Sequence, residues 1–265
     1  LAQLGCYGLA EASLLVSGAR WGDPPFLTVD RADLEKGVVT VREPGPGALE
    51  LVSSGRVQAH HEVRIVDRQT CEEVHDGQVG EIWFRGPSVG AGYWNRTEET
   101  TTTFGATLRG DGDRPFLRTG DAGFLHGGQL FVTGRTKDLL IVRGRNLHPE
   151  DIEEAAQRSD PRLRPGSAVA FPLQTGEEDA IALLQETTEE DGAALRQLAA
   201  GVRRAVTAAV GARVSTIYLV RRRSVLRTSS GKIRRRATQA ALEAGRVAVL
   251  HVDADTAPSL GMEMA

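Results

Sequence analysis

The pattern of apolar residues changes near residues 135–138, and this change most restricts what the chain can fold into. Before it, short runs with β-branched and aromatic residues stand between turn formers, as in Glu62–Asp67 and Gly80–Arg85. After it, runs with strand character alternate with segments of helical periodicity. The sequence therefore predicts two domains, 1–136 and 137–245, joined by a short segment rather than a long linker.

A tight hairpin and a further strand are expected before the second domain. Residues 123–125 and 129–133 flank His126, Gly127 and Gly128, and the two glycines give the backbone the freedom that a hairpin turn requires. The apolar run Asp138–Arg143, closed by Gly144, is predicted to be the next strand.

The second domain is expected to have a small α+β plan. Pro149 suits the first turn of a helix, where its missing N–H costs nothing, and Glu150 and Asp151 favour the positive end of the helix dipole. Residues 191–210 show helical periodicity, with apolar side chains on one face. The other expected elements are strands at 167–172, 180–185 and 214–220, a helix at 233–244, and a tail or linker at 246–265. This order begins as a split β-α-β pattern.

Composition excludes several classes of function. The net charge is −3, so the chain as a whole has no electrostatic attraction for nucleic acid or an anionic membrane. Arginines do gather at 221–223 and 234–236, where they form either a solvated face or a site for phosphate or an acidic partner. No apolar stretch approaches the roughly 20 residues that span a bilayer.

Cysteine usage and the N-terminus suggest a cytoplasmic location. Cys6 and Cys71 are the only cysteines and lie far apart, which provides neither a disulfide framework nor a zinc site and suits a reducing compartment. The N-terminus lacks the basic-then-apolar layout of a signal peptide. The sequence begins at Leu1, and the first residues have the pattern of a chain that starts within a fold, so we expect a fragment of a longer protein.

The segment Thr228–Lys232 superficially resembles a phosphate-binding P-loop. That motif requires Gly at 226 and Ser or Thr at 233, where this chain has Leu226 and Ile233, and it also requires a preceding strand. The sequence therefore excludes a P-loop at this position.

Four short motifs carry residues suited to nucleotide chemistry. In Tyr7–Glu11, an aromatic face can stack on a base, Gly8 allows close backbone approach, and Glu11 can hold Mg²⁺ near phosphates. In Arg118–Asp121, the Asp121 carboxylate can accept both hydroxyls of a ribose. Arg135, in the third motif, can donate to ribose or phosphate oxygens in a fork geometry.

Lys232 is the functional residue of the fourth motif. A lysine on a mobile loop can move toward negative charge that develops during a reaction. Taken singly, each of the four motifs is better explained as an ordinary turn, a paired surface arginine or a solvated basic loop. Their combination and their order in the chain favour a common site.

These motifs resemble, in sequence order, those of the adenylate-forming (AMP-binding) superfamily. The resemblance runs from about Gly5 to Ala244 and includes Gly80–Trp83 and Gly92–Trp94 as well as the four motifs above. It implies the distal, strand-rich part of the large α/β N-terminal domain followed by a small, mobile α+β C-terminal domain. The parent enzyme would use ATP and Mg²⁺ and activate a carboxylic acid as an acyl-adenylate.

The resemblance also implies roles for individual residues. Tyr7 and Gly8 would line the adenine site, and Glu11 would act at the Mg²⁺ ion or the phosphates. Asp121 would hold the ribose hydroxyls, and Arg135 the ribose or the α-phosphate region. The last two residues implied belong to the second domain: Lys137 as the hinge and Lys232 as the catalytic lysine that bridges carboxylate and α-phosphate.

Within the superfamily, the amino-acid sequences of the motifs are most similar to those of fatty acyl-AMP ligases. Tyr7–Ser17 and Phe116–Asp121 are similar to motif sequences of that subfamily. Residues 18–54 resemble the insertion that the subfamily carries. The insertion implies that an acyl carrier protein, or a polyketide or peptide synthase module, replaces CoA as the acceptor; an ordinary loop insertion is the alternative. An acyl-CoA ligase and a non-catalytic docking or regulatory module remain alternative functions.

Two departures from the family bear on activity. Leu226 stands where the family usually has a proline that stiffens the lysine loop, so we expect a looser loop that keeps its charge. The family's N-terminal region, with the loop that grips the β- and γ-phosphates, has no counterpart in these 265 residues. We therefore expect the 265-residue piece to be inactive by itself.

Overall fold

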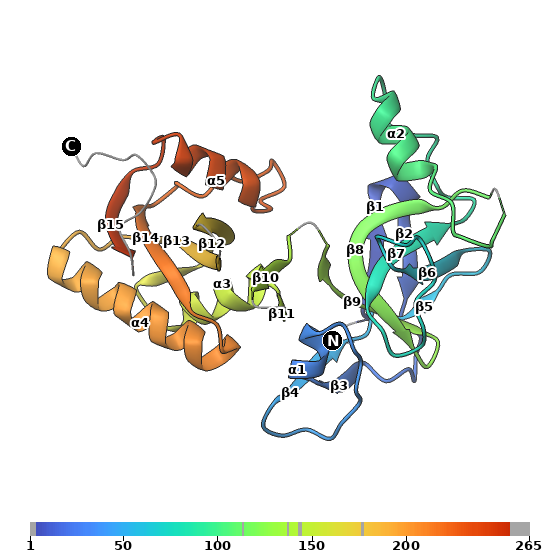
Figure 1. Cartoon of the computed structure of the whole chain (residues 1–265), viewed down its shortest axis with the longest axis horizontal. Coiled ribbons are helices and arrows are strands. Elements are labelled where there is room, and N and C mark those ends of the chain that lie inside the picture. Colours follow the sequence, from blue (N-terminus) through green and yellow to red (C-terminus); the bar gives the residue numbers. More distant parts are fainter. Residues whose placement is uncertain (1–3, 113, 137, 143–144, 176–177, 255–265) are drawn as a thin grey trace. The chain divides into compact units, whose positions relative to one another are not determined.

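A computed structural model describes residues 4–112, 114–136, 138–142, 145–175 and 178–254. The chain divides into two compact units, Leu1–Lys137 and Asp138–Ala265 (Figure 1). The division falls within the segment where the apolar pattern changes. The predicted hinge, Lys137, lies outside the described residues.

The first unit is built mainly from antiparallel strands. Its largest sheet has the order β6-β7-β8-β9, and a smaller sheet has the order β1-β2-β5. The strands are β1 (Cys6–Leu9), β2 (Leu14–Gly18), β3 (Phe26–Asp30), β4 (Ala48–Val52), β5 (Arg56–Val57), β6 (Glu62–Val66), β7 (Gly80–Arg85), β8 (Leu117–His126) and β9 (Gln129–Arg135). The helices are η1 (Ala10–Ala12), α1 (Arg31–Glu35) and α2 (Thr97–Phe104).

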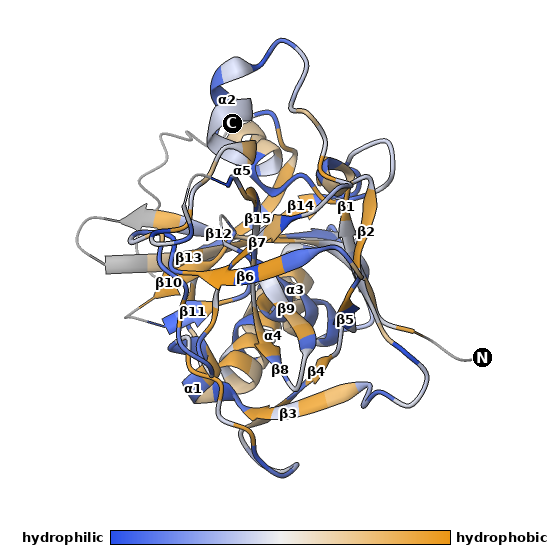
Figure 2. Ribbon diagram, turned by 90° about the vertical axis from the view of Figure 1, so that its right-hand side faces the viewer, coloured by the Kyte–Doolittle hydropathy of each residue, from blue (hydrophilic) through white to orange (hydrophobic). Residues whose placement is uncertain are grey.

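The region predicted as an insertion, residues 18–54, contains the paired strands β3 and β4 and the short helix α1. In Figure 1 these elements lie at one end of the first unit and α2 lies at the other. Figure 2 shows that β3 and β4 carry mostly hydrophobic residues. Val29 and Leu34 are buried against Phe124 and Phe131 of the β8–β9 hairpin, so these elements share a core with the main sheet.

Several sequence predictions for this unit are confirmed. β6 and β7 form where β-branched and aromatic residues between turn formers predicted strands. The β8–β9 hairpin closes with His126 opposite Gln129. Gly127 and Gly128 adopt φ values of 57° and 76°, the left-handed conformation that a two-residue hairpin turn needs and that glycine adopts without strain.

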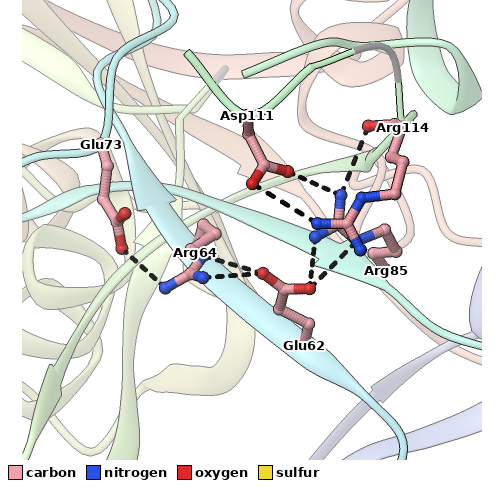
Figure 3. Close-up of polar contacts among 6 residues, drawn as sticks. All are labelled: Glu62, Arg64, Glu73, Arg85, Asp111 and Arg114. Carbon is pink, nitrogen blue, oxygen red and sulfur yellow. Dashed lines mark hydrogen bonds and ion pairs between the residues drawn. The ribbon is translucent and has the colours of Figure 1, made fainter. Parts of the chain in front are cut away.

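A chain of ion pairs braces the segment that leads into β8 (Figure 3). Arg85 donates to Glu62 and, at 2.8 Å, to Asp111, and its guanidinium lies 4.1 Å from the ring centroid of the buried Phe116. Most of these groups are partly exposed, so each pair stabilises the unit by only about 0–1 kcal/mol. The linked ion pairs join, in order, Glu73, Arg64, Glu62, Arg85, Asp111 and Arg114.

The second unit is a four-stranded mixed sheet with helices on both faces. Its order is β12-β13-β14-β15, and only β13 and β14 are parallel, joined through α4 as a parallel connection requires. The strands are β10 (Leu140–Val142), β11 (Arg145–Leu147), β12 (Leu163–Thr175), β13 (Glu178–Thr187), β14 (Val214–Arg221) and β15 (Val249–Ala254). The helices are α3 (Pro149–Arg158), α4 (Gly192–Val210) and α5 (Arg235–Glu243).

Strand alternation divides the core of this unit into two layers. One face of the sheet, with Ala170 and Leu183, packs on α3 and α4, whereas the other, with Phe171 and Leu184, packs on α5. The long helix begins as predicted, because the Asp191 side chain accepts hydrogen bonds from the first free N–H groups of α4. The helices predicted from Pro149 and at 233–244 also form, as α3 and α5.

One prediction for the C-terminal segment is wrong. Residues 246–265 were expected to form a tail or linker, but Val249–Ala254 forms the edge strand β15, antiparallel to β14. Its short apolar run has too few residues to show a period, and β14 supplies the hydrogen-bond partners that make it a strand. The rest of the predicted tail, residues 255–265, lies outside the described residues. Over the described part of the chain, no helix combines the length and apolarity needed to cross a membrane.

Candidate functional site

Three of the predicted site residues come together in the first unit. The Tyr7 hydroxyl donates a hydrogen bond of 2.6 Å to Oδ2 of Asp121. The other carboxylate oxygen of Asp121 lies 3.4 Å from Nε of Arg135. Tyr7 is on β1, whereas Asp121 and Arg135 face each other across the β8–β9 pair. An aromatic ring, a carboxylate and a guanidinium thus form one cluster, the Asp121 cluster.

The backbone around Asp121 is fixed by two threonines. The Thr119 hydroxyl donates to the Ile82 carbonyl at 2.6 Å and accepts from the Asp121 N–H at 3.1 Å. The Thr136 hydroxyl and N–H both donate to the Gly120 carbonyl, at 2.8 and 3.0 Å. Gly120 itself has a φ of 73°, a conformation that most side chains oppose. The position of the carboxylate is therefore set before any ligand binds.

Burial dominates the electrostatics of the cluster. It raises the pKa of Asp121 above the usual value for an aspartate, although the hydrogen bond from Tyr7 and the charge of Arg135 oppose this rise. Burial, followed by the negative charge of Asp121, also raises the pKa of Tyr7, so its hydroxyl remains a donor. The Arg135 side chain is 69% exposed, so its pair with Asp121 is weak and its guanidinium is accessible to a ligand.

Glu11 lies next to this cluster, and its negative charge contributes to the raised pKa of Asp121. The Tyr93 hydroxyl donates to Oε1 of Glu11 at 2.7 Å. Burial, then this hydrogen bond, raises the pKa of Tyr93 to about 12, so the tyrosine stays protonated and holds the carboxylate. The role of Tyr93 was not predicted, although its place in Gly92–Trp94 gave a signal.

The donor set suits Mg²⁺ that is shared with a phosphate. Within the described ranges, no group of three or more His, Cys, Asp or Glu residues is arranged to hold a metal ion. Mg²⁺ commonly takes one or two carboxylates from the protein and the rest of its ligands from phosphates and water. Glu11 can be such a carboxylate.

Gly8 has a structural reason to lack a side chain. A Cβ atom at this position would lie 1.7 Å from the Leu14 carbonyl oxygen on β2. The close approach of β1 and β2 therefore requires glycine here, whether or not a base lies over the backbone.

A buried carboxylate behind the cluster was missed by the sequence reasoning. Glu81, only 4% exposed, accepts hydrogen bonds from Nη2 of Arg118 at 2.6 Å and from Nε1 of Trp83 at 3.1 Å. Arg118 is three residues before Asp121, so the pair ties β7 to the part of β8 that carries the cluster. A glutamate within the apolar strand sequence G-E-I-W-F was the signal for this contact.

Lys232 belongs to the second unit, where its side chain is exposed. Its backbone N–H donates to the Thr228 hydroxyl at 3.0 Å, and the Thr228 N–H donates to the Lys232 carbonyl at 2.8 Å. Arg227 and Ile233 form an antiparallel bridge at the base of this turn. The segment Val225–Arg234, hereafter the lysine hairpin, is thus an ordered turn within its unit.

Comparison with known proteins supports the family resemblance. The family described as AMP-binding enzyme matches residues 2–94. The medium-chain-fatty-acid–[acyl-carrier-protein] ligase JamA of Moorena producens is 40% identical over 237 residues, covering 87% of this chain and 40% of that protein. The long-chain-fatty-acid–AMP ligase FadD32 of Mycolicibacterium smegmatis is 36% identical over 280 residues, covering 91% of this chain and 44% of that protein.

A solved structure matches as well. It comes from studies of fatty acyl-adenylate ligases from E. coli and L. pneumophila, with a TM-score of 0.77 and 32% identity, and it covers 91% of this chain and 42% of that one. The predicted resemblance to AMP-binding enzymes, with fatty acyl-AMP ligases among the relatives, is confirmed, and so is the mixed α/β, strand-rich fold. The chain spans less than half the length of the relatives it matches.

The raised pKa of Asp121 predicts a pH-dependent effect on stability. An acid whose pKa is higher in the folded than in the unfolded protein contributes stability at low pH, and this contribution is lost as the pH rises through the folded pKa. Asp121→Asn removes the charge but keeps an oxygen that can accept from Tyr7. We expect a melting temperature a few degrees above wild type at pH 7, and a smaller difference near pH 4.

Calorimetric melting of both proteins across this pH range checks the prediction. Asp111→Asn is a matched control, because Arg85 lowers the pKa of Asp111. Its stability loss should be present at pH 7 and should shrink as the pH falls. Equal pH profiles for the two variants would contradict the sign assigned to Asp121.

Proposed function

We propose that the full-length protein is a fatty acyl-AMP ligase, which activates a fatty acid with ATP and passes the acyl group to an acyl carrier protein. The observation that carries this proposal is the Asp121 cluster, with Glu11 beside it. An aromatic ring, a carboxylate fixed by its backbone and an accessible guanidinium provide for a base, a ribose and a phosphate in turn. The related proteins act on fatty acids by their names.

Each residue of the cluster has a distinct role in this proposal. The Tyr7 ring stacks on the adenine, with Gly8 lining the same site, while Asp121 accepts hydrogen bonds from the ribose hydroxyls. Arg135 donates to the ribose or the α-phosphate. Glu11 would hold Mg²⁺, which is general for the family, and the ion would supply positive charge near the phosphates.

The reaction then proceeds in two steps. A carboxylate oxygen of the fatty acid attacks the α-phosphorus of ATP, the bond to the β-phosphate oxygen breaks, and pyrophosphate leaves. In the second step the thiol of the acceptor attacks the acyl carbon, loses its proton and displaces AMP. Rotation about Lys137 is proposed to exchange the arrangements needed for the two steps, as expected for the family.

Lys232 supplies positive charge in the first step. Attack of one anion on another concentrates negative charge on the oxygens between carboxylate and phosphorus. An ammonium group about 4 Å away stabilises such charge by roughly 1 kcal/mol in water and roughly 4 kcal/mol at an effective dielectric constant near 20. Lys232 is an exposed residue that directly follows the turn of an ordered hairpin, which suits a group that must reach a substrate.

The proposed acceptor is the phosphopantetheine thiol of an acyl carrier protein or of a polyketide or peptide synthase module. The acceptor named for the Moorena producens relative supports this choice. The exposed arginines at 221–223 would suit an acidic carrier protein. The proposed site of action is the cytoplasm, where the substrates ATP and carrier protein occur.

Lys232→Ala in the full-length protein is expected to lower the rate of pyrophosphate exchange by about 10²–10³, because loss of one preorganised charge-stabilising donor has an effect of this size. The affinity for AMP should change little, since the nucleotide residues lie on the other unit. Lys36→Ala, which removes an exposed lysine of the first unit, is the matched control. Near-wild-type exchange in Lys232→Ala would remove the lysine from the mechanism.

The acceptor is tested by offering the full-length protein ATP, a mixture of fatty acids and either CoA or phosphopantetheinylated carrier protein. Mass spectrometry should detect acyl-adenylate in both reactions and a thioester only on the carrier protein. Acyl-CoA as the main product would instead establish the alternative acyl-CoA ligase. If no acyl-adenylate forms at all, the remaining alternative is a non-catalytic docking or regulatory module.

A further inference from the structure

The lysine hairpin is attached to the rest of its unit by groups that the proposed mechanism does not use. At its first end, the Val225 N–H donates to Oε1 of Glu186 at 2.8 Å, and Glu186 is only 5% exposed. The Leu226 N–H donates to the hydroxyl of Thr238, a fully buried residue of α5, at 3.0 Å. Both hydrogen bonds fix the backbone where the chain leaves β14 for the hairpin.

The hydrogen bond from the Leu226 N–H changes the effect expected of Leu226 on the rigidity of the loop. Leu226 was expected to loosen the loop because it replaces a proline that stiffens it. A proline has no N–H and could not donate to Thr238. In this chain the hydrogen bond restrains the backbone at the position where the family uses a ring.

At its other end, the hairpin leads directly into Arg235, the first residue of α5. Nε and Nη2 of Arg235 donate to the two oxygens of Glu153 at 2.8 and 2.9 Å. The same guanidinium lies 2.8 Å from Glu150 and 3.5 Å from Asp138. Glu153 and Glu150 belong to α3, and Asp138 is the first residue after the predicted hinge.

Glu153 is held from the sheet side as well. Its Oε1 accepts a hydrogen bond of 3.1 Å from the Ala170 N–H of β12. The Glu153 side chain is 7% exposed and that of Arg235 is 18% exposed. A buried ion pair of this kind contributes little net stability, because the cost of desolvating both charges offsets their attraction. A bidentate ion pair nevertheless fixes the direction of both side chains.

We propose that Glu153 and Arg235 are positioning residues, which hold the C-terminal end of the lysine hairpin to α3 and so fix where Lys232 is presented. Neither residue touches the substrate in this role. Because Arg235 also contacts Asp138, the pair connects the hairpin to the start of the second unit, and a rotation there would carry Lys232 along as part of a rigid body. The proposal rests on the proposed function for its catalytic consequence and on the contacts alone for its structural one.

Two variants test the positioning role. Glu153→Gln keeps the size of the side chain but removes its charge and the bidentate ion pair. Arg235→Lys keeps the positive charge but loses the fork geometry of the guanidinium. Glu190→Gln is the matched control, because it removes the partner of Arg221 in an exposed ion pair of the same unit. All three are made in the full-length protein.

The first measurement is amide hydrogen exchange, which reports local opening without any substrate. In Glu153→Gln, the amides of Thr228, Lys232 and Arg234 should exchange about tenfold faster than in wild type, and those of α4 should be unchanged. The exchange rates of the same amides should rise less in Arg235→Lys and should not rise in Glu190→Gln. Unchanged hairpin exchange in Glu153→Gln would overturn the proposal; if that variant loses protection throughout the unit, the Arg235→Lys result decides in the same way.

The second measurement is pyrophosphate exchange, corrected for the fraction of folded protein. Glu153→Gln should lower kcat at least tenfold and leave KM for ATP within about twofold of wild type, because the nucleotide residues belong to the other unit. A fall in kcat no larger than that of Glu190→Gln would show a purely structural role and overturn the proposal. If the wild-type protein forms no acyl-adenylate, the proposed function is wrong. The hydrogen-exchange comparison alone would then test the positioning role.

Discussion

The candidate site depends on one carboxylate, that of Asp121, which the first unit holds in a partly buried position. Burial away from water makes this charge costly, and two other strands supply donors to the carboxylate: the Tyr7 hydroxyl on β1 and the Arg135 guanidinium on β9. A carboxylate in this situation gains strongly from further donors. The two hydroxyls of a ribose are donors of this kind, which connects the cost of the buried charge to the proposed binding of a nucleotide.

Buried carboxylates also organise the elements around the two proposed functional groups. Glu81 holds Arg118 behind the Asp121 cluster, while Glu153 and Glu186 hold the two ends of the lysine hairpin. In each case the acid accepts from a group that needs a defined position. Such contacts add little to the free energy of unfolding, but they select one geometry among several compact alternatives. The second unit can thereby present an exposed lysine on a backbone that is itself well ordered.

Local patterns in the sequence were sufficient for most of the secondary structure. The β-branched and aromatic residues of β6 and β7, the glycine pair of the β8–β9 hairpin and the Pro149 start of α3 each have a local physical cause, and these elements were found correctly. β15 was missed because an edge strand of six residues takes its stability from β14 rather than from its own pattern. The 3.6-residue periodicity of α4, by contrast, extends over 19 residues and could not be mistaken.

The candidate site was harder to predict, because its contacts join distant parts of the chain. Tyr7 and Asp121 are 114 residues apart, and only the combined order of the motifs and its resemblance to a known family indicated a common site before the structure did. Glu81 and Glu153 lie in segments that read as an ordinary strand and an ordinary acidic helix start. Their role depends on which arginine packs against them, and this is decided by the tertiary structure.

The most direct test of the central claim compares AMP with its 2′-deoxy and 3′-deoxy analogues by isothermal titration calorimetry. If Asp121 accepts from the ribose hydroxyls, loss of either hydroxyl should weaken binding to the wild-type protein by about tenfold, as expected for a hydrogen bond to a charged group. In Asp121→Asn the same loss should cost less than about twofold. An equal penalty in both proteins would contradict the account, because the hydroxyls would then be recognised elsewhere.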